Sequence, residues 1–291
     1  MLRWSIAILK SSGGLLIKHF ESHLIHLFLG ELPEFENSQI IIKGTGNVLV
    51  CKSSVKLVNC NLIFNGNNSL IYLCESRHAY HMTVSLYNNS VLYIGKSNFM
   101  NGAYKPTINI TISEHTHCFI GNDCMISFDI WMRTADPHLI YSCSTNERLN
   151  LSKSIYIGDH VWIGQSVMML KGTEIDSGSI ISANSLVAGK NIHHNEIWGG
   201  NPSSKIKESI FWERSCVHGW DEDDTQNSLN FSSIAEKKHL PMEVYKFEYD
   251  ERVCISYKEI EEKLSSKDIK SKIDYLDYIT SIDEKNRFVH Y

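Results

Sequence analysis

The chain has 291 residues, a net charge of −5 and a pI of about 6.3; 43% of its residues are hydrophobic and 21% are charged. This composition is ordinary for a globular protein and excludes a globally basic surface that would bind a nucleic-acid backbone. The eight cysteines include no CxxC pair, so we expect reduced thiols and a cytoplasmic location.

The N-terminal segment alternates short apolar runs with charged residues. Residues such as Lys10 and Glu21 interrupt these runs, so the sequence predicts neither a transmembrane span nor a signal peptide. Apolar residues recur at helical spacing between Leu15 and Phe28. We therefore expect a helical segment over 1–35 that packs on the main body, with peripheral association at the inner face of the membrane as the alternative.

Short apolar segments between Asn and Gly turns come next. Residues 40–50, 55–64 and 67–73 are typical of strands. Further along, the pairs Ile120-Gly121 and Ile126-Ser127 stand six residues apart. These segments predict less regular coils of the repeat that follows.

A six-residue period dominates residues 155–189. The residues at one phase of this period are all apolar: Ile157, Ile163, Met169, Ile175, Ile181 and Val187. A helix would drift out of phase because six is not a multiple of 3.6, and a strand has a period of two. The repeat instead predicts a coiled β architecture over 36–207, with three hexapeptides and roughly 18 residues per coil.

Two motifs carry a resemblance to a known family. IGDHVWIG (157–164) and GGNPSSKI (199–206) resemble the hexapeptide-repeat acyltransferases, and most of all the O-acetyltransferases of bacterial sialic acid, capsule or O-antigen polysaccharides. The resemblance implies a left-handed parallel β-helix that forms a homotrimer with sites between subunits. It also implies acetyl-CoA as the donor and a sugar hydroxyl of a bacterial glycan as the acceptor.

The repeat is interrupted before residue 155. Ile126 and Ile157 are not separated by a multiple of six, so an inserted active-site loop is expected at about 131–154. Relatives carry a histidine in such a loop, and His138 is the candidate here. Histidine titrates near neutral pH and is suited to take a proton from a sugar hydroxyl as the thioester is attacked.

Two neighbours of His138 are further candidates. Asp136 would orient the imidazole as the acid of a catalytic triad does, or it would only cap a turn. Arg133 would bind an anionic sugar or pair with a surface acid. His138 itself has the alternative role of a loop histidine with structural hydrogen bonds.

The motif at 157–164 supplies two outward corner residues. Trp162 would line the groove for pantetheine or acceptor and stabilise the oxyanion through its indole N–H, or it would form a subunit contact. His160 would contact the substrate, or it would be a surface or inter-subunit residue.

Small residues and lysines of the last coils are the candidates for binding coenzyme A. The resemblance implies that pantetheine approaches the backbone at Ser182, Ala183, Ala188 and Gly189. The adenosine phosphates would meet Lys190, Lys205 and Lys207, with solvated lysines as the alternative.

A zinc site is the competing interpretation for the histidines. His115 and His117 share a strand face, and related β-helix proteins include carbonic anhydrases with three histidine ligands. The downstream ligand spacing of that family is absent, so no metal is expected.

The period ends at residue 208, and 208–291 is expected to form an α-containing cap or arm, helical over 257–279. The sequence thus predicts an acetyl-CoA-dependent O-acetyltransferase. Two alternatives remain: an N-acetyltransferase of an amino nucleotide sugar, and a non-catalytic β-helix scaffold or binding protein.

Overall fold

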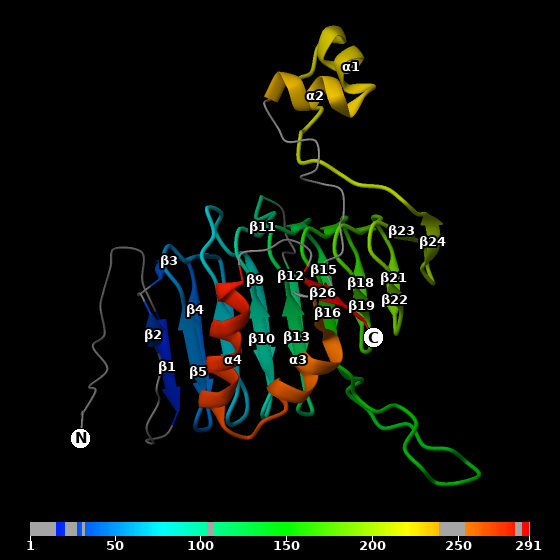
Figure 1. Cartoon of the computed structure of the whole chain (residues 1–291). Coiled ribbons are helices and arrows are strands. Elements are labelled where there is room, and N and C mark those ends of the chain that lie inside the picture. Colours follow the sequence, from blue (N-terminus) through cyan, green and yellow to red (C-terminus); the bar gives the residue numbers. More distant parts are fainter. Residues whose placement is uncertain are drawn as a thin grey trace.

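The computed structural model describes residues 16–20, 28–30, 33–103, 108–238, 254–282 and 287–290. It is a parallel β-helix whose coils stack along one axis, with helices against one side (Figure 1). The predicted fold class, a mainly β solenoid with an inserted loop and a C-terminal α-containing segment, is confirmed.

Three sheets form the walls of the solenoid. The first sheet contains β1 (Leu16–Phe20), β4 (Gln39–Lys43), β7 (Asn61–Phe64), β9 (Met82–Leu86), β12 (Ile108–Ile112), β15 (Ile130–Arg133), β18 (Met168–Leu170) and β21 (Leu186–Ala188). The second sheet contains β2 (Phe28–Gly30), β5 (Val48–Cys51), β8 (Leu70–Leu73), β10 (Val91–Ile94), β13 (His117–Ile120), β16 (Ile155–Ile157), β19 (Glu174–Ile175) and β22 (Asn191–Ile192).

The third sheet contains β11 (Phe99–Met100), β14 (Met125–Ile126), β17 (Trp162–Ile163), β20 (Ile180–Ile181), β23 (Ile197–Gly199) and β24 (Ser204–Lys207). β3 (Glu34–Glu36) and β6 (Lys56–Val58) form a short parallel pair. β23 and β24 pair antiparallel, so the coil reverses there and the solenoid ends.

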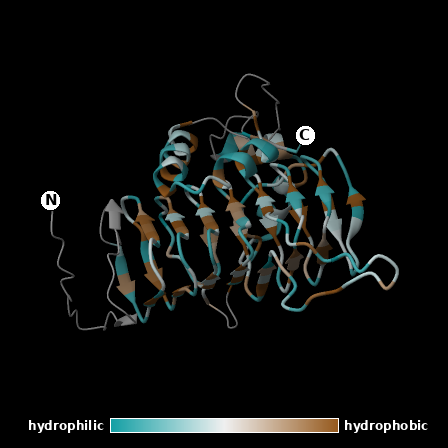
Figure 2. Ribbon diagram, turned by 90° about the horizontal axis from the view of Figure 1, so that it is seen from below, coloured by the Kyte–Doolittle hydropathy of each residue, from teal (hydrophilic) through white to brown (hydrophobic). Residues whose placement is uncertain are grey.

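The six-residue phase found in the sequence marks the inside of the solenoid. All six residues of that phase, from Ile157 to Val187, are fully buried, each stacked over its equivalent in the next coil. Figure 2 shows hydrophobic segments recurring from strand to strand along the stack. The burial of this apolar ladder is the main stabilising contribution, at about 25 cal/mol per Å² of apolar surface.

The coils differ in length along the chain. Gln39 bonds to Asn61, 22 residues on, whereas Asp159 bonds to Ser177, 18 residues on. Many corners of the coils have a residue with positive φ, often Asn, Asp or Ser, such as Asn59 at 54°. These residue types tolerate that conformation. Coils of 22 residues do not divide into three hexapeptides, which explains why the upstream coils carry no strict hexapeptide pattern.

The helical expectation for the N-terminal segment is wrong where the structure describes it. Residues 16–20 and 28–30 are β1 and β2, and they pair parallel with β4 and β5. The edge of the following coil offers backbone donors and acceptors to this segment, and pairing with that edge outweighs the helical spacing. The rest of 1–32 lies outside the described residues.

The C-terminal segment supplies the helices α1 (Glu222–Ser228), α2 (Phe231–Lys238), α3 (Tyr257–Leu264) and α4 (Ile269–Ser281), and the pair β25 (Ile255–Ser256) and β26 (Phe288–Val289). The helices expected over 257–279 are α3 and α4. In Figure 1 they lie across the outer face of the second sheet, whereas α1 and α2 stand apart from the coils.

Aromatic residues join α3 and β26 to the second sheet, and α4 adds the aliphatic residues Ile273, Leu276 and Ile279 to the same cluster. The rings of Tyr93 and Phe119 stack at 4.4 Å, and those of Tyr156 and Tyr257 at 5.1 Å. Phe288 meets the Phe119 ring edge-on at 4.9 Å. This cluster buries large apolar area on the outside of the second sheet, which holds the cap in place.

Candidate active site

The inserted segment between β15 and β16 forms an arm that projects from the coils (Figure 1). Its two sides pair across the Tyr141–Arg148 bridge, and the Leu149 amide donates to the Ile140 carbonyl at 2.8 Å. Several large apolar side chains of the arm are more than half exposed: Leu139, Ile140, Tyr141, Leu149 and Leu151. An exposed apolar group of this size is typical of a surface that contacts another molecule.

His138 lies at the start of this arm with an exposed side chain. Its backbone carbonyl accepts a hydrogen bond from Asn150 Nδ2 at 2.7 Å. The imidazole is therefore presented to solvent on a backbone that Asn150 fixes, which suits a general base that must meet an incoming hydroxyl.

Asp136 is engaged by residues other than His138. Its carboxylate accepts from Lys171 Nζ at 2.6 Å and from Asn150 Nδ2 at 3.1 Å. These two hydrogen bonds hold the pKa of Asp136 below its ordinary value, and the one from the Lys171 ammonium has the larger effect. Asp136 thus anchors the base of the arm to the next coil, and among the described contacts the imidazole of His138 is not one of its partners. Its assignment as the orienting acid stays a prediction.

Lys171 and Asn150 were not found by sequence reasoning. Lys171 could have been found from the register of the coils, because it occupies the corner of the coil that follows the one with Asp136. The two residues are 35 positions apart in the chain. Asn150 has no periodic signal, because the arm obeys no repeat. Together they make the arm's base a defined structure.

A second clamp holds the arm farther out. Arg148 donates two hydrogen bonds to the Glu114 carboxylate, at 2.9 and 2.8 Å, and Ser152 adds a third. Glu114 belongs to the corner after β12, one coil earlier. The bidentate geometry restricts the orientation of the arm more than a single contact would.

The contacts of Glu114 with Arg148 and Ser152 should be detectable in the pKa of its carboxyl group. Arg148 and Ser152 lower the pKa of Glu114 from 4.5 to about 2. Because the folded pKa is depressed, the clamp contributes fully above pH 4.5 and is lost as the pH falls toward 2. Arg148→Met is expected to return the pKa of Glu114 most of the way to its ordinary value, as measured by carbon-13 NMR of the carboxyl. Ser152→Ala should produce a smaller rise, and an unchanged titration in Arg148→Met would contradict the clamp.

His160 and Trp162 lie at a different corner from His138. His160 follows β16 at the corner between the second and third sheets, whereas the arm leaves the corner between the first and second. His160 Nδ1 and Asp123 Oδ2 are 2.7 Å apart, and the imidazole stacks on Trp212 at 3.9 Å. Within one chain these candidates therefore do not form a single site.

The C-terminal segment closes over His160. Trp212 Nε1 donates to the His160 carbonyl at 3.0 Å, and Arg214 pairs with Asp123 at 2.9 Å. Burial alone would raise the pKa of Asp123, but its hydrogen bond to His160 and the charge of Arg214 leave the pKa below its ordinary value. This packing supports the structural alternative for His160 and identifies Trp212 and Arg214 as residues that sequence reasoning missed.

Trp162 points outward from β17 in the third sheet and is 38% exposed. Its ring lies 5.9 Å from that of Trp212, centroid to centroid. Its neighbours in register are Met125 and Ile180, so it stands in an apolar row on the outside of this sheet. The side chain is available to a ligand or to a second subunit.

The candidates for the coenzyme divide between two corners. Ser182 and Ala183 follow β20 on the third sheet, and β24, with Lys205 and Lys207, lies in the same sheet. Ala188, Gly189 and Lys190 lie instead at the end of β21, on the same corner as the arm.

The small and basic residues of the two corners have different surroundings. Ala183, Ala188, Gly189 and Lys207 are exposed. Lys205 pairs with Glu196 at 3.2 Å and with Glu208 at 2.7 Å. Lys207 is therefore a better candidate than Lys205 for an incoming phosphate, because no carboxylate of the described residues pairs with its ammonium group.

Arg133 and the histidines of the zinc alternative complete the candidates. Arg133 is exposed at the end of β15, with its guanidinium 5.2 Å from the centroid of the Trp131 ring. His117 is fully buried, and burial, with smaller contributions from Lys272 and His115, lowers its pKa to about 3. Within the described residues, His115, His117 and His138 do not form a metal-binding group.

Comparisons with known proteins identify the class. No family model matches the chain. A polysialic acid O-acetyltransferase of Neisseria meningitidis is 30% identical over 188 residues, which cover 64% of this chain and 85% of the relative. A galactoside O-acetyltransferase of Lactococcus lactis is 32% identical over 124 residues, 42% of this chain and 58% of the relative.

A solved structure supports the same fold. The crystal structure of the polySia-specific acetyltransferase NeuO matches with a TM-score of 0.60 and 23% identity, over 74% of this chain and 94% of that chain. The protein is an acyltransferase built on a β-helix. More specifically, it belongs to the hexapeptide-repeat acetyltransferase family that includes the polysialic acid O-acetyltransferases. Within the described residues, no helix has the length and apolar character needed to cross a membrane.

Proposed function

We propose that the protein transfers an acetyl group from acetyl-CoA to a hydroxyl of a polysialic acid or related bacterial glycan. The observation that carries the proposal is the combination of an exposed His138 on a clamped arm with a chain that aligns along 85% of a polysialic acid O-acetyltransferase. An anionic acceptor also agrees with the basic residues beside the arm. These are Arg133, at the start of the inserted segment, and Lys153, near its end.

In this proposal His138 is the general base. Its imidazole takes the proton of the sugar hydroxyl while the oxygen attacks the thioester carbonyl. The tetrahedral intermediate collapses, the C–S bond breaks, and the proton passes to the departing CoA thiolate. No covalent enzyme intermediate is needed, and a backbone or indole N–H stabilises the oxyanion.

The complete site would require more than one copy of the chain. The arm with His138 and the outward face with Trp162 lie at different corners of the same solenoid. A homotrimer would bring the arm corner of one subunit against the third-sheet face of its neighbour, in a closed symmetric ring. The exposed apolar side chains of the arm would be covered in that assembly.

The donor would then lie between subunits. Trp162, Ser182, Ala183 and Lys207 would meet it from one subunit, and Ala188, Gly189 and Lys190 from the other. His160 would act mainly by holding the C-terminal segment against this wall, since its ring stacks on Trp212.

The proposed function is tested by following the release of CoA thiol from acetyl-CoA. Polysialic acid should support turnover, and a neutral polysaccharide of similar length should not. Mass spectrometry of the product should show an O-linked acetyl group that is removed by mild base. Turnover with an amino nucleotide sugar alone would favour the N-acetyltransferase, and the absence of both turnover and CoA binding would favour a scaffold.

A further inference from the structure

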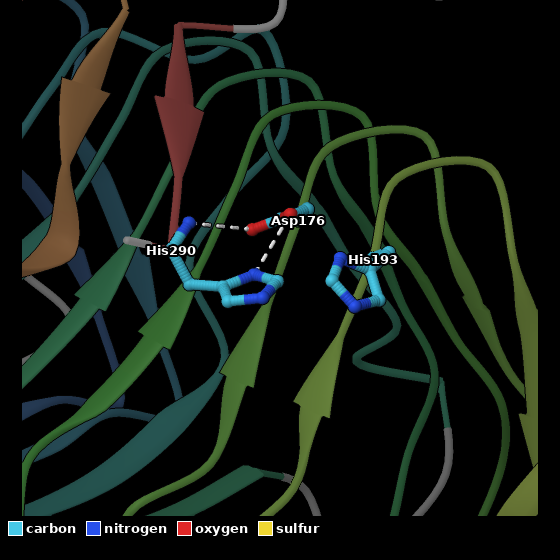
Figure 3. A group of neighbouring side chains, drawn as sticks. All are labelled: Asp176, His193 and His290. Atoms are coloured by element: carbon cyan, nitrogen blue, oxygen red, sulfur yellow. Dashed lines mark hydrogen bonds and ion pairs between the residues drawn. The ribbon is translucent and has the colours of Figure 1, made fainter.

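Three potential metal ligands meet where the C-terminal segment crosses the last coils. Asp176 follows β19, His193 follows β22 one coil later, and His290 follows β26. One ligand atom from each lies within 4.8 Å of the others, and this is the one such group within the described residues. Figure 3 shows the two imidazoles on either side of the Asp176 carboxylate.

The carboxylate is buried and held in a fixed direction. Asp176 is 2% exposed, and its Oδ1 accepts the backbone N–H of His290 at 3.2 Å. Its Oδ2 lies 3.0 Å from His290 Nδ1. Two ligands of a tetrahedral zinc ion, each at about 2.0–2.1 Å, are about 3.3 Å apart, so this pair already has a spacing close to that of ligands on a common ion.

The third ligand stands on an ordered backbone. The His193 carbonyl accepts from Ser179 Oγ at 2.7 Å, and its N–H donates to Glu196 Oε2 at 3.2 Å. The ring centroids of His193 and His290 are 4.3 Å apart. The His193 side chain is exposed, so rotation about its side-chain torsions brings a ring nitrogen to an ion without moving the coil.

We propose that Asp176, His193 and His290 bind a divalent transition-metal ion of the zinc type. Two imidazoles and one carboxylate are a donor set that zinc accepts, and the exposed side of the cluster leaves a fourth position for water. Binding replaces the Nδ1 proton of His290, which is released to solvent. The ion offsets the buried charge of Asp176, and the His290 backbone N–H orients the carboxylate from behind.

The ion would fasten the segment 287–290 to two successive coils. The same segment is already attached by Arg287, whose guanidinium pairs with Asp159 at 2.9 Å. None of the three ligands belongs to the acetyl-transfer machinery proposed above. The inference therefore stands or fails independently of that function, and the ion has a structural role.

The test uses tag-free full-length protein that has been stripped with a chelator. Isothermal titration with Zn²⁺ is expected to show one tight site per chain, and Co²⁺ is expected to give the visible absorption of a low-symmetry nitrogen and oxygen site. His193→Ala should weaken Zn²⁺ binding at least about tenfold. Because His193 is exposed, this variant should keep its fold, which circular dichroism will show.

The matched control is His194→Ala, which removes an adjacent exposed imidazole that is not one of the three ligands. It should retain the Zn²⁺ affinity and the rise in melting temperature that Zn²⁺ produces, whereas His193→Ala should lose both. The proposal is overturned if stripped wild-type protein binds no Zn²⁺. It is equally overturned if His193→Ala binds as the wild type does, or if both variants weaken binding equally.

Discussion

Replacing His138 with alanine is expected to lower kcat for acetyl transfer about 10²–10⁴-fold, the usual contribution of a positioned general base. The side chain is exposed and forms no hydrogen bond with the residues that the structure describes, whereas Asn150 holds the backbone of the arm through the His138 carbonyl. The variant should therefore keep its melting temperature and its affinity for acetyl-CoA. Stopped assays of CoA thiol release with polysialic acid would give kcat and KM separately.

Two control variants distinguish chemistry from architecture. His218→Ala removes an exposed histidine outside the arm and should leave kcat unchanged. Asn150→Ala removes hydrogen bonds to Asp136, to the His138 carbonyl and to the Ile140 amide, so it should disorder the arm and raise KM as well as lower kcat. If His138→Ala stays within about threefold of wild type, the proposed base is wrong.

Loss of Arg287 is expected to be the most destabilising single change in the cap. Its side chain is fully buried and donates to Asp159 from Nε at 3.0 Å and from Nη2 at 2.9 Å, and Nη1 bonds to the Ile279 carbonyl at 2.8 Å. Arg287→Ala leaves a buried carboxylate without its cation, which costs about 3–5 kcal/mol. Urea unfolding at constant protein concentration would measure this loss.

The matched control is an exposed ion pair that joins the same cap to the same sheet. Lys52 and Asp277 are 2.7 Å apart with side chains 33% and 46% exposed, so Lys52→Ala should cost no more than about 1 kcal/mol. The double variant Asp159→Asn/Arg287→Met should be more stable than Arg287→Ala, because no unpaired charge stays buried. Equal losses in Arg287→Ala and Lys52→Ala would contradict this account of the anchor.

The position of Asp159 shows why a motif can be recognised without its role being understood. It is the acid of IGDHVWIG, and the motif identifies the class of enzyme. In the structure its carboxylate accepts from the Asn122 amide one coil earlier at 2.6 Å and from Arg287 in the cap. The first contact joins equivalent corners of successive coils, whereas the second depends on the path of the cap, and neither follows from the motif itself.

The sequence by itself determined the solenoid, its buried ladder and the site of the inserted arm. A repeat of six fixes which side chains face inward, since each coil contacts only its neighbours and burial follows a local pattern. The interruption of that repeat located the inserted arm for the same reason, and the family resemblance then singled out His138 within it. The helix predicted from the apolar spacing over 15–28 was wrong, because the strands found there are stabilised by pairing with the next coil, which is a tertiary contact.

Only the tertiary structure decided which candidates can act together. His138 and Trp162 lie at different corners of the solenoid. The carboxylate of Asp136 accepts a hydrogen bond from Lys171, whereas the sequence predicts that it would orient His138. The tertiary structure also brought His290 to Asp176 across 114 residues. Contacts of this kind depend on the path of the arm and of the cap, which follow no repeat, so no periodic pattern in the chain records them.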